Sequence, residues 1–295
     1  MTLFIPSPSI SFFQIGPLTI HIYALCLITG IFAGWALGAR RWRARGGTTE
    51  TFETVLLWTI PLGIVGARIY HVLTHLGDYV GAGATQHWWA IWEGGIAIYG
   101  AVGMGALVAW LMCRWQRVSF AALADSLAPG IALGQAIGRF GNWFNQELYG
   151  QPTTLPWGLE IDAAHRAPGF EQYATFHPTF LYEALWNLFV MGVLLWADKK
   201  FRLGRGKVFA LYVALYGFGR IFTEHLRLDY SYDTFGPIRF NEAAAMLICA
   251  GGILAFAWLS KYRPGREEVV EFARPGRAAP SGEPATAPAE PGTAE

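Results

Sequence analysis

The segment from Gly138 to Gly150 carries side chains that could do chemistry at the point where an apolar stretch of the chain ends. Arg139, Asn142 and Glu147 supply a cation, an amide and a carboxylate. Such groups are costly in lipid unless they are paired, hydrated or bound to a ligand, so an ionisable cluster at membrane depth indicates a functional site. Helical spacing brings Asn142, and either Asn145 or Gln146, close to Arg139 on one face, which gathers donors for an anionic group. The alternative is that Arg139 only extends to the lipid headgroups.

A second cluster of the same kind runs from Tyr216 to Glu224. Arg220 and Glu224 are four residues apart, so they can form an ion pair on one helix face, with Tyr216 one turn further along it. A structural pair that neutralises itself is the alternative, but it does not account for a second arginine at the depth of Arg139. Guanidinium presents a planar, permanently charged donor fork to phosphate oxygens. The two clusters together therefore predict a site that handles a phospholipid headgroup.

Several further polar residues fall at the same predicted depth, toward the external half of the spans. Each of them alone is more typical of packing or of an aromatic belt than of direct function. Their shared depth makes them candidates for contact with the substrate: Tyr23, Arg68, Tyr99 and His177. Gly150 is expected to end the first cluster or to turn the loop that follows it.

The surroundings of these clusters are those of a membrane protein. Hydrophobic residues make up 53% of the chain and charged residues only 15%, compared with roughly 25% charged residues in soluble domains. Apolar stretches long enough to cross a bilayer recur up to about Ser260. We therefore expect an all-α fold, a polytopic bundle of about seven transmembrane helices, with spans near residues 18–39, 52–73, 94–113, 120–141, 179–197, 208–226 and 241–260.

The distribution of basic residues predicts the orientation of the bundle. Most of the 22 Lys and Arg residues follow the first, third, fifth and seventh spans, and cytoplasmic loops carry the excess of such residues. The N-terminus is therefore expected outside and the C-terminus in the cytoplasm. This orientation places both clusters at the external, periplasmic side of the inner membrane.

Three regions are expected along the chain. Residues 1–17 form a short external lead, and residues 18–262 form the transmembrane catalytic domain. Within that domain, the loop at 142–178 is long enough to be a lid or a binding element, with a simple extramembrane cap as the alternative. The Pro-, Ala- and Glu-rich segment at 263–295 is expected to be a disordered cytoplasmic tail.

Composition and motif spacing argue against several classes of function. A net charge of +1 without a basic stripe argues against a nucleic-acid partner. No His and carboxylate cluster has metal-ligand spacing and no Gly-rich phosphate loop follows a strand, so no metal or other cofactor is expected. A lipid transporter, which would place charges near the midplane in paired repeats, and a noncatalytic phospholipid-binding protein are the alternatives to an enzyme.

Residues 138–150 resemble the signature of bacterial phosphatidylglycerol:prolipoprotein diacylglyceryl transferases, with the pattern Gly-Arg-x-Gly-Asn-x-x-Asn-x-Glu-x-x-Gly complete. The resemblance extends from about Pro17 to Ser260, and seven spans with the N-terminus outside agree with that family. Further matching segments are His21-Ile22-Tyr23, Gly66-Ala67-Arg68, Trp92-Glu93-Gly94-Gly95, His177-Pro178 before Tyr182-Glu183, and Tyr216-Gly217-Phe218-Gly219-Arg220 with Glu224.

The resemblance implies transfer of the diacylglyceryl group of phosphatidylglycerol to the lipobox cysteine thiol of a preprolipoprotein. A thioether forms and glycerol phosphate leaves. Arg139 and Arg220 would hold the phosphate and stabilise charge on the leaving group. The other catalytic positions implied are Asn142, Glu147, Tyr23, Tyr216 and Glu224, and the other substrate-binding positions are Asn145, Gly150, Tyr99, Arg68 and His177.

One departure from the family pattern concerns the base that takes the thiol proton. Some family members have a histidine in the segment Gly-Gly-x-x-x-His-Gly, whereas this chain has Tyr99 at that position. A thiol with a pKa near 8.5 must lose its proton to become strongly nucleophilic, and tyrosine with a pKa of about 10 is a poor base at neutral pH. We expect Tyr99 only to position lipid or peptide, with the proton passing to Glu147, Glu224, His177 or water.

Overall fold

The computed structural model describes residues 4–80, 87–91, 94–228, 233–235 and 238–272. Long helices dominate this part of the chain, and the few strands form two-stranded hairpins. The helices are α1 (Ile22–Ala44), α2 (Thr49–Thr74), the one-turn α3 (Leu76–Tyr79), α4 (Ile98–Gln116), α5 (Phe120–Asn145), α6 (Thr179–Phe201), α7 (Lys207–Leu226) and α8 (Phe240–Tyr262). The strands are β1 (Phe12–Ile15), β2 (Leu18–His21), β3 (Leu159–Glu160), β4 (Thr175–Phe176), β5 (Asp233–Phe235) and β6 (Ile238–Arg239), and a short 3-10 helix lies at Ala163–His165.

Each of the seven predicted spans falls on one of the long helices, so the prediction of a polytopic helical membrane protein is confirmed. Six of them, α1, α2, α4, α5, α6 and α8, are long and apolar enough to cross a membrane. The helix α7 is 20 residues long but carries Arg220 and Glu224 within its length, and it is not among the six. The helix that bears the second polar cluster is thus the one long helix of the described residues that is not among these six.

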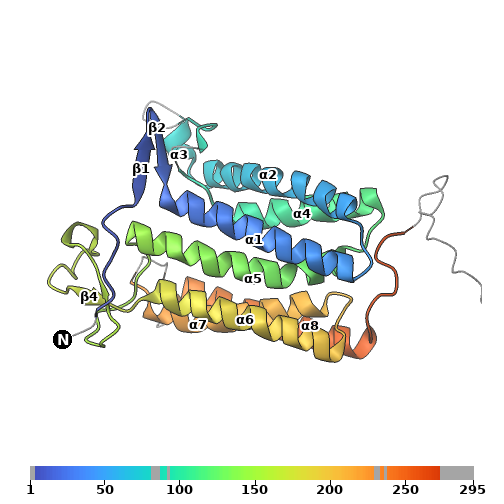
Figure 1. The fold of residues 1–295 in the computed structure, drawn as a ribbon. Coiled ribbons are helices and arrows are strands. Elements are labelled where there is room, and N and C mark those ends of the chain that lie inside the picture. Colours follow the sequence, from blue (N-terminus) through green and yellow to red (C-terminus); the bar gives the residue numbers. More distant parts are fainter. Residues whose placement is uncertain (1–3, 81–86, 92–93, 229–232, 236–237, 273–295) are drawn as a thin grey trace, which may run out of the picture.

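The first span begins later than predicted. Leu18–His21 form β2, which pairs antiparallel with β1, and α1 starts only at Ile22. The turn between the two strands contains Gly16, whose φ of 59° is a conformation that favours glycine. The resulting hairpin projects from one end of the bundle, which we call the hairpin end; the opposite end, where residues 263–272 lie, is the tail end (Figure 1).

The central helices α1 and α5 pack closely because glycines face one another between them. A Cβ atom added to Gly30 would lie 2.8 Å from the carbonyl oxygen of Gly134, and one added to Gly34 would lie 2.7 Å from that of Gly130. Small residues let helix backbones approach within a membrane, where packing drives association. In Figure 1, α2 and α4 lie on one side of this central pair, and α6, α7 and α8 lie on the other.

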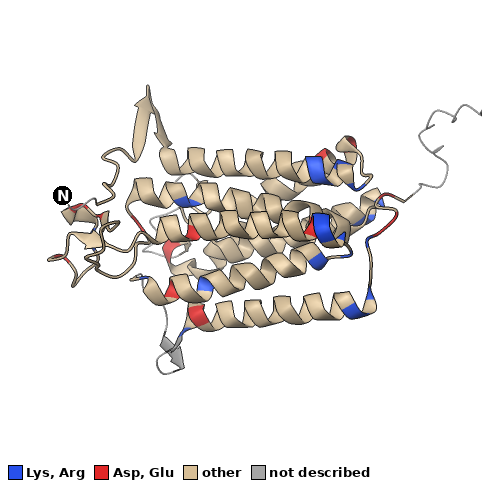
Figure 2. Ribbon diagram, turned by 60° about the horizontal axis from the view of Figure 1, so that its bottom comes forward, with Lys and Arg blue, Asp and Glu red and all other residues tan. Residues whose placement is uncertain are grey.

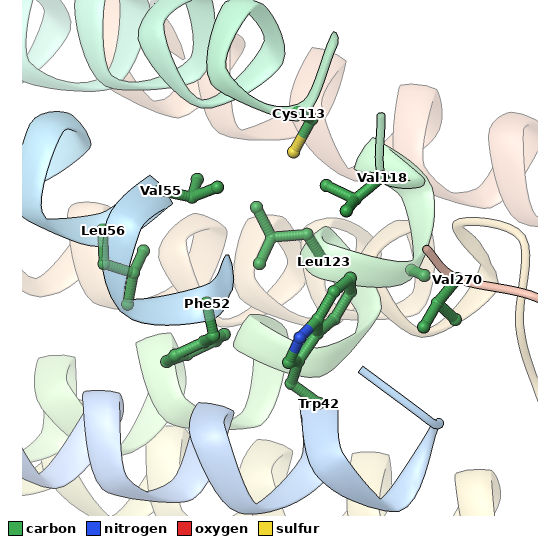
Figure 3. Packing of buried hydrophobic residues seen from close by; sticks show 9 residues of the cluster. Trp42, Phe52, Val55, Leu56, Cys113, Val118, Leu123 and Val270 are labelled. Atoms are coloured by element: carbon green, nitrogen blue, oxygen red, sulfur yellow. The ribbon is translucent and has the colours of Figure 1, made fainter. Parts of the chain in front are cut away.

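The tail end has its own apolar core. Trp42, Phe52, Leu123 and Val270 are almost fully buried there and belong to one cluster (Figure 3). Val270 lies in the segment that the sequence assigned to a disordered tail. Its carbonyl oxygen accepts a 2.9 Å hydrogen bond from the Ser119 backbone nitrogen.

Residues 263–272 are therefore ordered, contrary to the prediction of disorder from residue 263. Glu267 lies 3.6 Å from Arg45, and the Arg266 guanidinium contacts Asp198, so this segment is bound by charges as well as by apolar contacts. The prediction for residues 273–295 lies outside the described residues.

Buried charges also tie the helices together at the tail end, where most Lys and Arg residues gather (Figure 2). Arg45, directly after α1, lies 3.2 Å from Asp198 on α6 and 3.8 Å from Asp125 on α5. Asp125 also accepts hydrogen bonds from the backbone nitrogens of Gly206 (3.0 Å) and Phe209 (2.9 Å), and so caps α7. Removing one charged side chain from this buried network would leave its partner as an uncompensated buried charge, which destabilises the fold.

At the hairpin end, the segment after α5 folds into a small extramembrane layer. β3 and β4 pair within it, and Tyr149, Leu159, Ile161 and Phe176 form its buried core. Gln146 binds this layer to α5, because its side-chain nitrogen donates to Asp162 at 2.6 Å while its side-chain oxygen accepts from the Asp162 backbone. The predicted loop at 142–178 thus begins with the last turn of α5 and continues as an ordered layer.

Candidate functional site

A cavity of about 650 Å³ runs along the glycine-rich contact between α1 and α5. Its lining on α5 extends from Leu127 to Asn142, about 22 Å at the usual helical rise. Most of the lining is apolar or glycine, whereas the polar groups Tyr23, Arg139 and Arg220 lie toward the hairpin end. The cavity therefore suits an amphiphile with a polar group at one end and hydrocarbon along the rest.

A carboxylate joins the two predicted arginines at the polar end of this cavity. Arg139 Nη2 on α5 lies 2.6 Å from Glu183 Oε2 on α6, and Arg220 Nη1 on α7 lies 3.1 Å from the same oxygen. The Glu183 side chain is only 5% exposed, while both arginines also line the cavity. Sequence analysis predicted that Arg139 and Arg220 lie at one depth, and the structure brings them onto a single anion.

The predicted ion pair within α7 is present. Arg220 Nη2 contacts Glu224 Oε1, and Arg227 Nη1 lies 3.6 Å from the same oxygen. The Glu224 side chain is 1% exposed, so its charge is compensated by arginines and not by water. The backbone oxygen of Glu224 accepts a 3.0 Å hydrogen bond from Arg239, which fixes the end of α7 to the start of α8.

A chain of hydrogen bonds leads from Arg139 to Glu147. Arg139 Nη1 donates to Asn142 Oδ1 at 3.2 Å, and Asn142 Nδ2 donates to Glu147 Oε1 at 2.8 Å. Asn145 Nδ2 donates to the same carboxylate oxygen at 3.3 Å. Gln146 has a φ of 52°, so α5 ends there and the chain turns back, which lets Glu147 face Asn142. Glu147 itself is exposed.

The two predicted catalytic tyrosines line the cavity from opposite helices. Tyr23 packs against α5 where Gly141 leaves room, since a Cβ atom there would lie 2.5 Å from Tyr23 Cδ2. Tyr216 stacks on Tyr212 with ring centroids 5.8 Å apart, and Tyr212 donates a 3.0 Å hydrogen bond to Gln135. Both tyrosines thus line the same cavity as the arginines.

Gly150 and His177 lie beside the site without lining the cavity. The Gly150 backbone nitrogen donates to the His177 carbonyl at 2.9 Å, and a Cβ atom on Gly150 would lie 2.8 Å from His177 Cβ. His177 Nδ1 is 3.2 Å from Tyr182 Oη, and burial holds the pKa of this histidine below its ordinary value. These residues join the extramembrane layer to the start of α6.

Arg68 and Tyr99, both predicted to contact substrate, are not among the residues that line this cavity. The guanidinium of Arg68 is buried and donates to the backbone carbonyls of His87, Trp88, Gly94 and Gly95 at 2.6 to 3.0 Å. Such a set of bonds makes Arg68 an anchor for the segment between α2 and α4. Tyr99 is largely exposed, packs near Tyr70, and is not among the residues that line the cavity.

Glu183 was not predicted as a member of the site, although it lies in a segment that matches the family pattern. The signal was present, because a carboxylate inside an apolar span is costly and marks a functional site by default. The sequence contains several carboxylates of this kind, and only the folded structure shows that Glu183 is the one that lies between Arg139 and Arg220. No group of three or more metal-ligating side chains occurs among the residues that the structure describes.

A helical membrane bundle with two arginines at the end of an apolar cavity defines a membrane protein that handles an amphiphile with an anionic group. Comparison with known proteins narrows this class. The family described as prolipoprotein diacylglyceryl transferase matches residues 10–258. The chain therefore belongs to the prolipoprotein diacylglyceryl transferase family, and it is an enzyme of lipoprotein biosynthesis.

Three relatives illustrate the similarity. The chain is 51% identical to the phosphatidylglycerol-prolipoprotein diacylglyceryl transferase of Cutibacterium acnes over 267 residues, which cover 90% of each protein. It is 48% identical over 292 residues to transferase 2 of Streptomyces coelicolor, covering 99% of this chain and 92% of that one. The enzyme of Mycobacteroides abscessus is 44% identical over 279 residues, covering 90% and 80% respectively.

Proposed function

We propose that the cavity binds phosphatidylglycerol, with its phosphate on Arg139 and Arg220 and its acyl chains along α1 and α5. The observation that carries this proposal is the pair of arginines on a shared anion at the polar end of a long apolar cavity. Guanidinium forks suit phosphate oxygens, and glycines leave the apolar wall open to hydrocarbon.

The reaction that fits this arrangement joins the acceptor cysteine to the carbon of the diacylglycerol unit that bears the phosphate, and the other glycerol leaves with that phosphate. The thiolate sulfur forms a bond to that carbon, and the bond from the carbon to the phosphate oxygen breaks. The oxygen keeps the bonding electrons and leaves as glycerol phosphate, so negative charge grows on the phosphate. Arg139 and Arg220 would stabilise that charge more strongly in the transition state than in the bound lipid.

The thiol proton needs an acceptor at the same end of the cavity. Glu147 is exposed, and Asn142 and Asn145 orient its carboxylate next to the arginine site, which supports it as this acceptor. Glu224 is buried and already engaged by arginines. His177 does not line the cavity.

The proposed orientation puts the hairpin end on the periplasmic side of the inner membrane. The gathering of Lys and Arg residues at the tail end supports it, because such residues are retained on the cytoplasmic side (Figure 2). In this orientation the site opens toward the compartment in which secreted preprolipoproteins arrive. The lipobox cysteine of such a protein would be the acceptor.

One experiment tests the donor, the acceptor and the role of the arginines together. Detergent-purified protein is incubated with phosphatidylglycerol and a peptide that contains a lipobox cysteine, and mass spectrometry follows the mass of the cysteine. We expect a diacylglyceryl adduct with the wild type and little with Arg139→Lys. A noncatalytic lipid-binding protein or a transporter would give no adduct with either, while a related transferase in the same assay gives one.

A further inference from the structure

Glu183 occupies the place where an anion is best held in this site. A single oxygen, Oε2, lies 2.6 Å from Arg139 Nη2 and 3.1 Å from Arg220 Nη1. The three side chains come from three different helices, α5, α6 and α7, and all are largely buried. The contact therefore holds the two guanidinium groups on one point without help from the substrate.

Electrostatics explains why the site needs an anion when it is empty. Two arginines facing one space away from water repel each other, and an unpaired buried charge is strongly destabilising. Glu224 compensates Arg220 and Arg227 within α7 and its C-terminal end, and Asn142 contacts Arg139 only as a neutral amide. Glu183 is the carboxylate that compensates Arg139 among the ion pairs of the described residues.

The same contact becomes unfavourable once a phosphate arrives. Each guanidinium has a limited number of N–H donors. Arg139 Nη2 and Arg220 Nη1 are both directed at Glu183 Oε2, and a phosphate oxygen would have to replace that oxygen to bind them. A carboxylate and a phosphate at that point would also repel each other. Either the phosphate binds beside Glu183 at a cost, or it displaces the carboxylate.

A small void adjoins Glu183. The void is about 10 Å³ and is lined by Glu183, Asn187, Tyr216, Gly219 and Thr223 among others. Asn187 Oδ1 is buried there without a hydrogen-bond partner. Tyr216 and Arg220 line both this void and the cavity, so the void adjoins the polar end of the cavity next to Glu183.

We propose that Glu183 is a resident counter-anion of the arginine pair, which the phosphate of the donor lipid displaces and which returns when glycerol phosphate leaves. It is a positioning residue: it holds Arg139 and Arg220 on one point between turnovers and competes with phosphate for them. This competition weakens binding of the lipid and speeds release of the product. The proposal rests on the phosphate-binding role of the two arginines.

The proposal predicts an effect opposite to that of a merely structural residue. Glu183→Gln removes the charge with little change of shape, and the new amide group could donate to the unpaired Asn187 oxygen. Phosphate would then meet no competing anion. We expect half-inhibition of transfer by added glycerol 1-phosphate at about one tenth of the wild-type concentration, roughly the contribution of one hydrogen bond to a charged group, with a lower KM for phosphatidylglycerol and a lower kcat.

The experiment measures kcat, KM and inhibition by glycerol 1-phosphate for the purified full chain with a lipobox peptide. Glu171→Gln is the matched control, since Glu171 is an exposed carboxylate of the extramembrane layer, and should leave all three unchanged. If Glu183→Gln raises KM and weakens inhibition, Glu183 only supports the arginines and the proposal is wrong.

A second variant keeps the test decisive if Glu183→Gln does not fold. Glu183→Asp retains the charge but withdraws it from the arginines, so it should tighten inhibition by an intermediate factor; inhibition no tighter than that of the wild type overturns the proposal. The phosphate-binding role itself is tested separately by Arg139→Lys. If that variant transfers normally, the proposed function fails, whereas failure of the Glu183 variants alone leaves it standing.

Discussion

Gly34 on α1 and Gly130 on α5 touch through their backbones at the middle of the bundle. A Cβ atom on Gly34 would lie 2.7 Å from the Gly130 carbonyl oxygen, a distance at which the helices would have to separate. Both glycines also line the cavity. The same contact thus holds the central helices together and leaves the cavity wall without side chains.

Replacing Gly34 by valine should destabilise the protein. The new side chain overpacks a backbone contact, which typically costs about 1 to 3 kcal/mol. The measurement is thermal unfolding in detergent, followed by tryptophan fluorescence. Gly103→Val is the control, because an added Cβ at Gly103 meets no atom within 4 Å. Equal unfolding temperatures for the two variants would contradict the close packing of α1 on α5.

Arg139→Lys should lower kcat/KM by about a hundredfold or more, the usual range for loss of a donor aimed at developing charge. Lysine keeps the charge but lacks the planar fork that can contact a carboxylate or phosphate and Asn142 together. Arg43→Lys on the exposed face of α1 is the control and should behave as the wild type. A loss below threefold at Arg139 would argue for a general attraction of anions without specific geometry.

The helices and the two arginines could be predicted because they depend on local patterns. An apolar stretch of membrane length predicts a span, and a charge within it stands out. The hairpin could not be predicted in this way, because Leu18 and Ile20 continue the apolar stretch of α1 toward the N-terminus. Their pairing with β1 depends on the turn at Gly16 and on contact across the two strands.

The parts of the site that escaped prediction depend on contacts between distant residues. Glu183 lies between two arginines that come from α5 and α7, and no spacing along the chain encodes that meeting. Arg68 donates to backbone carbonyls, and contacts of this kind leave no mark in the sequence. Its predicted role in substrate binding stays a prediction. Tyr99 was expected near lipid or peptide, and its role stays a prediction.

Acid should destabilise the protein in part through His177. Burial lowers the pKa of His177 in the folded state, so below its ordinary pKa of about 6.5 the unfolded chain binds the proton more readily than the folded one. The contribution of neutral His177 to the free energy of unfolding is fully present above pH 6.5. It is lost as the pH falls from 6.5 through the lower pKa that His177 has in the folded protein. His177→Asn should therefore show a smaller fall in unfolding temperature between about pH 8 and pH 5.5 than the wild type.

His165→Asn is the control for that titration, since His165 is an exposed residue of the same extramembrane layer. The comparison concerns the change with pH, because loss of the contact between His177 and Tyr182 lowers stability at every pH. If His177→Asn and the wild type lose the same stability on acidification, other groups carry the acid sensitivity.

Arg68→Gln should destabilise the segment between α2 and α4 before it affects chemistry. The buried guanidinium satisfies four backbone carbonyls, and each carbonyl left without a donor costs about 1 to 3 kcal/mol. Limited proteolysis should cut this segment faster in the variant than in the wild type, while KM for phosphatidylglycerol changes little among molecules that remain folded. A large rise in KM with unchanged proteolysis would restore the substrate-binding role expected from the sequence.

Val270→Ala should lower the free energy of unfolding by about 1.6 kcal/mol, the value of two buried methylene-sized groups. Val270 is 2% exposed and packs in the cluster with Trp42 and Phe52, although it lies beyond the last helix. Its neighbour Val269 is 54% exposed, so Val269→Ala is a matched control that should change nothing. Chemical denaturation in detergent measures both. Equal stability of the two variants would show that residues 263–272 contribute no packing and would restore the prediction of a tail that is disordered from residue 263 onward.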